Sequence, residues 1–408
     1  MPLLEDTQRK LAAFQAKVRD VASTTFPYPE AEAALRVIED KVQERLDSLT
    51  RLSGSSSRET VVESCRTAVQ IIPIYLPIVG FCLRSKNINN PLEAYWPLLR
   101  LSRQLAGEGC QLILSSEWQF SPYTYLQVPY LTDYVLIGLP ASESSNALLL
   151  PLAGHELGHT LWAKEKCSNT YRPHVYAKVI DLFLARWDDF QQYETSLKEE
   201  EFEGSLLGLK YYQAPIDWAL RQLEEVFCDV IGLRLFGAAY LHAFAYFLAP
   251  GDPAARSRHY PHLAQRAQYL ALAAAKFKVS LPTSFVDQFE EENAGNQGLD
   301  SFQIAIADEA CSQLVADVIA QVNRLGEDRS LPDPSGEEVE TVVENFRLLV
   351  PARSPTSASQ VLNAGWKAHA RTDLWSEYEQ IQDDRDRVLN ELILKSLEAL
   401  EVSARRDG

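Results

Sequence analysis

The chain has 408 residues, of which 46% are hydrophobic and 23% charged, and its 56 acidic against 39 basic residues leave a net charge of -17. This length is enough for two or three domains with buried cores, and the apolar content is too high for a disordered chain. The negative balance argues against a protein that binds nucleic acid or an anionic membrane, since both require a local excess of cationic side chains.

The sequence carries no pattern that indicates export or membrane insertion. Its first residues lack the basic stretch and apolar stretch of a secretory signal. The most apolar run, Ile71 to Leu83, is 13 residues long, shorter than the about 20 residues that cross a bilayer, and it predicts a buried segment. The six cysteines have no paired spacing, so neither a zinc ribbon nor a disulfide framework is indicated. We therefore expect a soluble protein of the cytoplasm without a membrane span.

The N-terminal region, residues 1–116, is predicted to be helical. Apolar residues recur at spacings of three and four from Leu11 to Val21 and again from Leu35 to Leu49, on either side of a proline-containing break at Phe26 to Pro29. This pattern predicts a helical hairpin. The hairpin either packs on its own domain or offers a coiled-coil surface to a partner or a second copy of the chain.

The pattern changes between Trp118 and Pro140, where tyrosine, valine, threonine and leucine dominate and prolines punctuate the chain. Tyr123 to Leu126 and Tyr134 to Ile137 are therefore predicted strands of a small sheet or hairpin. Helical patterns return at Leu148 and continue to the end of the chain, with loops expected at residues 249–253, 292–298 and 326–336.

The string from Gly154 to Trp162 carries the strongest chemical signal, because it contains the pattern HExxH. Two histidines four residues apart on a helix, His155 and His159, project from one face with Cβ atoms about 5–6 Å apart, as two ligands of a tetrahedral metal ion require. Glu156 would lie across the open position of the metal, where a general base for a bound water must be. The alternative for this pattern is a pair of hydrogen-bonded histidines on a buried helix.

A catalytic zinc needs a third protein ligand. A third histidine six residues later, behind a glycine, would be typical of a metzincin, but Glu165 and Trp162 hold the corresponding positions. Glu225 and Asp229 are a better pair, since they lie four residues apart within an apolar helical segment. Glu225 can bind the metal while Asp229 accepts a hydrogen bond from a ligand histidine. Glu224 points about 100° away from Glu225 on the same helix and is placed outside the site.

The order HExxH, then ExxxD, then a loop at residues 258–266 that contains histidine, proline and arginine resembles the gluzincin metallopeptidases, most closely the HtpX-like and CAAX-prenyl peptidase clan. The resemblance covers residues 155–266. It implies that His155, His159 and Glu225 bind zinc and that Glu156 is the base. It also implies that Asp229 hydrogen-bonds a ligand histidine without binding the metal itself. This chain departs from those relatives in two ways: it lacks their spanning helices, and Tyr260 separates His259 from Pro261.

Metallopeptidases also need a hydrogen-bond donor for the oxyanion of the tetrahedral intermediate. The resemblance implies His259 or Arg266 for this task, and three other side chains of the region are rivals: His262, Tyr260 and Tyr240. An edge strand that pairs with extended substrate is a further gluzincin feature, for which residues 134–139 are the best match, with an ordinary interior strand as the alternative. Residues 160–215 are long enough to cover the cleft as a lid, or else form a solvated insertion.

The sequence thus predicts a mostly helical (α+β) chain with a zinc metallopeptidase domain at residues 117–280, flanked by helical regions at residues 1–116 and 281–408. We expect a cytoplasmic Zn²⁺-dependent hydrolase that cleaves peptide bonds of protein or peptide substrates. The alternative is a regulatory or scaffold protein on a peptidase-derived domain, with a structural zinc and helical flanks that bind a partner. Glu156 favours the enzyme, since a retired active site has no need of the base.

Overall fold

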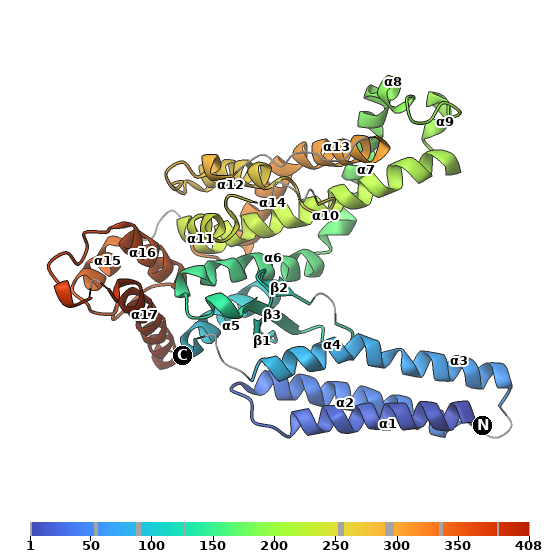
Figure 1. Ribbon diagram of the computed structural model, residues 1–408, viewed down its shortest axis with the longest axis horizontal. Helices are drawn as coiled ribbons and strands as arrows, with labels where there is room; N and C mark the ends of the chain where they lie inside the picture. The colour runs from blue at the N-terminus through green and yellow to red at the C-terminus, as the bar shows by residue number, and fades with distance from the viewer. Residues whose placement is uncertain are drawn as a thin grey trace. The chain divides into compact units, whose positions relative to one another are not determined.

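The computed structural model describes residues 2–52, 56–86, 91–125, 128–251, 257–289, 298–333, 338–381 and 383–407. It is mostly helical with one three-stranded sheet, in agreement with the predicted fold class. The chain divides into two compact units, one of residues 1–103 with 107–145 and one of residues 104–106 with 146–408 (Figure 1). Of the expected loops, residues 249–251 lie outside helices as expected, α14 runs to Asp328 within the loop expected at 326–336, and residues 252–253, 292–297 and 334–336 lie outside the described residues.

In its described residues, the first unit contains five helices and the sheet, and it ends with a short 3₁₀ turn. Its elements are α1 (Pro2–Ala22), α2 (Pro29–Thr50), α3 (Arg58–Val69), α4 (Ile71–Arg84), α5 (Leu92–Ala106, whose last turn belongs to the second unit), β1 (Gln111–Glu117), β2 (Tyr123–Thr124), β3 (Tyr134–Pro140) and the 3₁₀ turn η1 (Ala141–Glu143).

The predicted helical hairpin is confirmed as α1 and α2, which lie side by side (Figure 1). Its apolar stripe, with Leu11, Val18, Leu35 and Ile38, is fully buried in the core that the unit's helices share with β1 and β3. Burial of this stripe supplies most of the stability of such helices. The unit's own core therefore uses the surface that a coiled-coil partner would need.

The sheet has the order β1-β3-β2. β3 pairs with β1 in parallel along its whole length and with β2 antiparallel at Ile137 and Gly138. The predicted strands at 123 and 134 are confirmed, but β1 was missed, because a short apolar run such as residues 111–117 suits a buried strand or a helix equally. Since β3 has a neighbour on each side, its assignment as an edge strand is wrong and the interior alternative holds.

The apolar run at residues 71–83 forms α4, which follows α3 after a single residue, Gln70. Together Arg58–Arg84 makes a 27-residue helical segment whose most apolar 18-residue window has a mean hydropathy of 1.5, so by length and composition it could cross a membrane. One such segment is weak evidence for a membrane protein. Only one face of α4 is buried, because Ile74, Leu76 and Leu83 are 45%, 56% and 45% exposed. The prediction of a wholly buried segment is therefore wrong for that outer face.

The second unit is helical throughout its described residues. Its elements are η2 (3₁₀, Ala147–Leu152), α6 (Ala153–Lys164), α7 (Cys167–Ala185), α8 (Trp187–Phe190), α9 (Glu199–Phe202), α10 (Leu206–Phe236), α11 (Ala238–Leu248), α12 (Leu263–Phe277), η3 (3₁₀, Val286–Gln288), α13 (Leu299–Ser312), α14 (Val315–Asp328), α15 (Glu340–Arg347), α16 (Ala358–Ala370), η4 (3₁₀, Glu379–Ile381) and α17 (Arg385–Asp407).

α10 is the central element of this unit (Figure 1). Its 31 residues correspond to a length of about 46 Å. Every residue from Gln222 to Phe236 is buried, because α6 packs on one side of α10 and α12, α13 and α14 pack on the other. A helix segment that is buried on all faces needs neighbours all round, and this half of α10 has them.

The C-terminal helices hold the segment that leads into α6. The indole Nε1 of Trp366 in α16 donates to the carbonyl of Leu148, and the backbone N–H of Ala147 donates to Oδ1 of Asn390 in α17. The carbonyl of Leu148 and the N–H of Ala147 both lie in η2, directly before α6. Residues 281–408 therefore belong to the same compact unit as α6 and α10, and the unit boundary falls near residue 145 instead of residue 116.

Residues 165–205 fold into α7, α8 and α9 instead of lying over α6 as a lid. α7 packs along α10, and Phe183, Phe190 and Phe202 meet in one aromatic cluster with centroid distances of 5.0 to 5.6 Å. All three rings are fully buried. Burial of so much aromatic area fixes this segment on the N-terminal half of α10.

Candidate metal centre

Two glycines of the HExxH segment let α6 approach α10 closely. A Cβ atom on Gly158 would lie 2.6 Å from Cα of Cys228, and one on Gly154 would lie 3.0 Å from Cα of Gly232. No side chain fits in either gap, so only glycine permits this helix separation. The close approach brings His155, next to Gly154 in the chain, within reach of the acids on α10.

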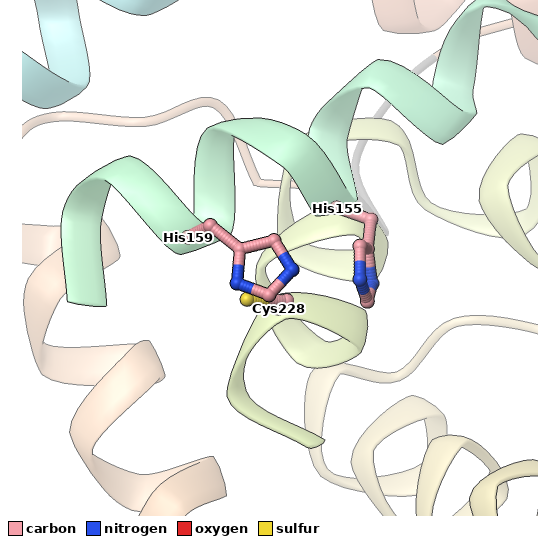
Figure 2. Close-up of side chains that lie close together, drawn as sticks. All are labelled: His155, His159 and Cys228. Carbon is pink, nitrogen blue, oxygen red and sulfur yellow. The ribbon is translucent and has the colours of Figure 1, made fainter. Parts of the chain in front are cut away.

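Both histidines direct Nε2 at one carboxylate. Nε2 of His155 lies 3.2 Å from Oε2 of Glu225, and Nε2 of His159 lies 3.8 Å from Oε1 of Glu225. The two imidazole rings are 4.9 Å apart between centroids, and Figure 2 shows them projecting from one side of α6 towards α10. The sequence-predicted set of His155, His159 and Glu225 is thus brought together by the fold.

Nδ1 of each histidine faces a second acid. Nδ1 of His155 lies 2.9 Å from Oδ1 of Asp229, and Nδ1 of His159 lies 3.0 Å from Oε1 of Glu224. The position of Asp229 agrees with the sequence analysis. Glu224 does not, because it reaches His159 although it was placed outside the site. Each imidazole has two ring nitrogens, so Nε2 can face Glu225 while Nδ1 faces a second acid of α10.

These contacts fit a divalent metal ion. Oε2 of Glu225 is buried and accepts no hydrogen bond, a costly state for a carboxylate oxygen unless a cation lies beside it. Nitrogen and oxygen ligands of a tetrahedral ion with bonds of about 2.0–2.1 Å lie about 3.3 Å apart, close to the 3.2 and 3.8 Å seen here. Without a metal, burial lowers the pKa of His155, but Asp229 and Glu225 outweigh burial and raise it to about 10.

Cys228 is a second candidate for the third ligand, and sequence spacing gave no reason to expect it. Its sulfur and the nitrogens of His155 and His159 lie within 4.8 Å of one another (Figure 2). Burial and the surrounding acids raise the pKa of the Cys228 thiol well above its usual value. The histidines instead hold the pKa of Glu225 below its usual value, although burial opposes them. Glu225 is therefore already ionised for metal binding, and we favour it over Cys228.

Glu156 lies in α6 next to His155 and is only 4% exposed. Burial raises the pKa of its carboxyl, while the two histidines act in the opposite direction. Within the described part of the chain, its carboxyl interacts through charge with the two histidines, Glu225 and Arg266. A carboxyl with a raised pKa suits proton exchange.

Arg266 and Tyr240 are both engaged with Asp229. Nε and Nη2 of Arg266 donate to the two oxygens of Asp229 at 2.8 and 2.9 Å, and the hydroxyl of Tyr240 donates to Oδ1 at 2.8 Å. Burial raises the pKa of Asp229, but Arg266 and His155 outweigh burial and hold it well below its usual range. Neither Arg266 nor Tyr240 is therefore a free donor for an oxyanion.

Among the other expected donors, the geometry favours Tyr260 over His259. His259 is exposed, and its imidazole makes no hydrogen bond or ion pair with the cluster in the part of the chain that the structure covers. The ring of Tyr260 lies 5.6 Å from the guanidinium carbon of Arg266. Tyr260 is itself 44% exposed. The charge of Glu225, helped by partial burial, raises the pKa of Tyr260 to about 12, so its hydroxyl stays protonated at neutral pH. His262, at the start of α12, is half-buried.

Comparisons with known proteins give no relative for this chain. No family model matches it, and neither curated proteins nor solved structures show a significant match. The chemistry of the centre therefore has to be argued from its own residues.

Proposed function

We propose that the protein is a zinc-dependent peptidase. One observation carries the proposal: Nε2 of His155 and of His159 both face the buried, hydrogen-bond-deficient carboxylate of Glu225, with the buried Glu156 beside them. Two histidines and a glutamate suit Zn²⁺, which in such a set keeps an open position for water.

Each side chain near the candidate metal position has its own task in the proposed reaction. Bound zinc supplies a Lewis acid that lowers the pKa of water and polarises a carbonyl. Glu156 accepts the proton of the attacking water and later delivers it to the leaving amine, since burial raises the pKa of its carboxyl. Tyr260 donates its hydroxyl proton in a hydrogen bond to the carbonyl oxygen of the scissile bond as negative charge develops there. Asp229 holds the ring of His155 in place.

The intact base also favours an enzyme over the regulatory alternative. A structural zinc needs four protein ligands and no neighbouring base. Here a buried carboxyl whose pKa is raised by burial lies next to the histidines, and a chemical task explains its place there.

The test compares the wild-type protein with Glu156→Gln, both loaded with zinc. Each is incubated with a denatured mixture of cellular proteins, and new peptide N-termini are identified by mass spectrometry. Glu156→Gln should bind zinc in the same amount and create new N-termini at a rate at least about 100-fold lower, the contribution typical of a general base. New N-termini at equal rates from both proteins would refute the proposal.

A further inference from the structure

The two histidines of the candidate metal centre receive unequal support from α10. Asp229, which faces Nδ1 of His155, is held by three hydrogen bonds from the buried side chains of Tyr240 and Arg266. Its orientation is therefore set by groups that themselves have little freedom. The acid of α10 that faces His159 has fewer hydrogen-bond partners.

Glu224 faces Nδ1 of His159 and has one cationic partner. Its Oε1 lies 3.0 Å from Nδ1 of His159, and its Oε2 accepts a hydrogen bond from Nη1 of Arg221 at 2.9 Å. The side chain of Glu224 is 5% exposed, whereas that of Arg221 is 61% exposed. The buried carboxylate of Glu224 thus lies between His159 and Arg221. Arg221 is exposed and lies one turn before Glu224 on α10.

We propose that Glu224 is the positioning residue of His159, and that Arg221 holds Glu224 in the orientation this requires. The inference rests on the proposed metal-binding function and adds a residue that the spacing of HExxH and ExxxD does not point to. A carboxylate at Nδ1 fixes the ring and its tautomer, which leaves the Nε2 lone pair directed at the metal position. Since Asp229 is occupied with His155, Glu224 alone does this for His159 among the described acids.

Because Arg221 is exposed, its contribution to zinc affinity through Glu224 should be small. Solvent and salt screen an ion pair with an exposed partner, so the pair contributes little to stability by itself. Arg221→Ala should therefore weaken metal binding by only about 2- to 5-fold, and the loss should shrink as salt is raised. Removal of the Glu224 carboxylate, which touches the histidine directly, should weaken binding by about 10- to 100-fold, as for other residues that support metal ligands.

The experiment measures Zn²⁺ affinity of the full chain by competition with a chromogenic chelator. Glu224→Ala should lose about 10- to 100-fold in affinity, and Glu224→Gln should lose less, because its amide oxygen still accepts from Nδ1 of His159. Asp217→Asn is the matched control. Asp217 lies on the same helix and pairs with Arg172 at 3.1 Å, with its side chain 48% exposed, so its loss should leave zinc affinity unchanged. The absorption bands of bound Co²⁺ should shift in both Glu224 variants and not in Asp217→Asn.

The outcomes separate this inference from the proposed function. Wild-type zinc affinity in Glu224→Ala, with an unchanged Co²⁺ spectrum, would overturn the role of Glu224 and leave the peptidase proposal standing. A wild-type protein that binds no zinc would overturn both. If Glu224→Ala does not fold, Glu224→Gln decides: reduced affinity supports the role of Glu224, and wild-type affinity together with a wild-type Co²⁺ spectrum overturns it.

Discussion

The acids around the two histidines differ in pKa direction, and the difference assigns their tasks. Burial raises the pKa of Glu156, and nearby cationic groups do not reverse the shift. Burial acts in the same direction on Glu225 and Asp229, but histidine and arginine partners outweigh it and keep both ionised. Pairs of carboxyls whose environments push their pKa values apart are typical of acid–base sites. Glu156 suits proton transfer, whereas Glu225 and Asp229 suit permanent negative charge.

The identity of the third ligand leads to the first prediction. Glu225→Ala should lose stoichiometric zinc, because the carboxylate that faces both Nε2 atoms is removed. Cys228→Ser should keep one zinc per chain, since the serine hydroxyl fills the space of a thiol that is not a ligand. Metal content of the purified variants, measured by elemental analysis, checks both. Zinc loss in Cys228→Ser with retention in Glu225→Ala would make the thiol the ligand.

The second prediction concerns the pH dependence of the metal-free protein. The pKa of His155 is about 10 in the folded protein, above the about 6.5 of an unfolded histidine. Its contribution to stability is therefore complete below pH 6.5 and is lost as the pH rises through 10. Urea unfolding in the presence of a chelator should show a steeper loss of stability from pH 7 to 10 in the wild type than in His155→Gln. Parallel curves for the two proteins would contradict the raised pKa.

The contact between α6 and α10 depends on residues without side chains. Gly154 and Gly158 lie one turn apart on α6, and the backbone of α10 lies against both at Gly232 and Cys228. Close packing therefore requires glycine at position 158, within the HExxH motif, and at position 154, directly before it. The histidines reach Glu225 and Glu224 because the helices are close, and a wider gap would leave the same residues without a common centre.

The third prediction tests this contact with one added methyl group. Gly158→Ala should destabilise the protein by about 1–3 kcal/mol, because the new Cβ would meet the backbone of Cys228 at 2.6 Å and force the helices apart. Zinc affinity should fall as well. Gly80→Ala, inside α4, is the control: its Cβ meets only the flexible end of Arg84, so it should be neutral or stabilising by about 0.5–1 kcal/mol. Equal effects in chemical denaturation would contradict the packing argument.

In the second unit, the core does not depend on the candidate metal. α10 is covered by α6, α7, α12, α13 and α14, and the C-terminal helices pin the start of α6. A chain of this length buries enough apolar surface to fold without a metal. The centre therefore sits on a framework that exists before the ion binds.

The fourth prediction follows from that independence. Removal of zinc with a chelator should lower the melting temperature by about 5 to 15 °C, the loss expected for a ligand present at 100 to 1,000 times its dissociation constant. Far-ultraviolet circular dichroism at 25 °C should remain helical. Glu225→Ala should melt at the same temperature with and without chelator. Unfolding of the wild type at 25 °C on chelation would indicate a structural zinc instead.

Local patterns in the sequence were sufficient for the helical character, the N-terminal hairpin, two of the strands and the choice of His155, His159 and Glu225 as candidate ligands. These features depend on spacing within one element, because residues four apart on a helix share a face whatever the rest of the fold does. β1 was missed because its three apolar residues, Leu112 to Leu114, carry no period long enough to separate strand from helix. The two-unit division depends on which helices share a core, and spacing along the chain does not contain that information.

Which side chains surround the histidines depends on distances between elements, and no spacing along the chain contains those distances. Glu224 joins the centre, and Cys228 lies beside it, because the glycines of α6 let α10 come within van der Waals contact. Arg266 and Tyr240 turn to Asp229, and the ring of Tyr260 lies against Arg266, because of how α11 and α12 pack against α10. The net charge of -17 argues against nucleic-acid binding from composition alone; the placement of four of those acids around two histidines required the folded chain.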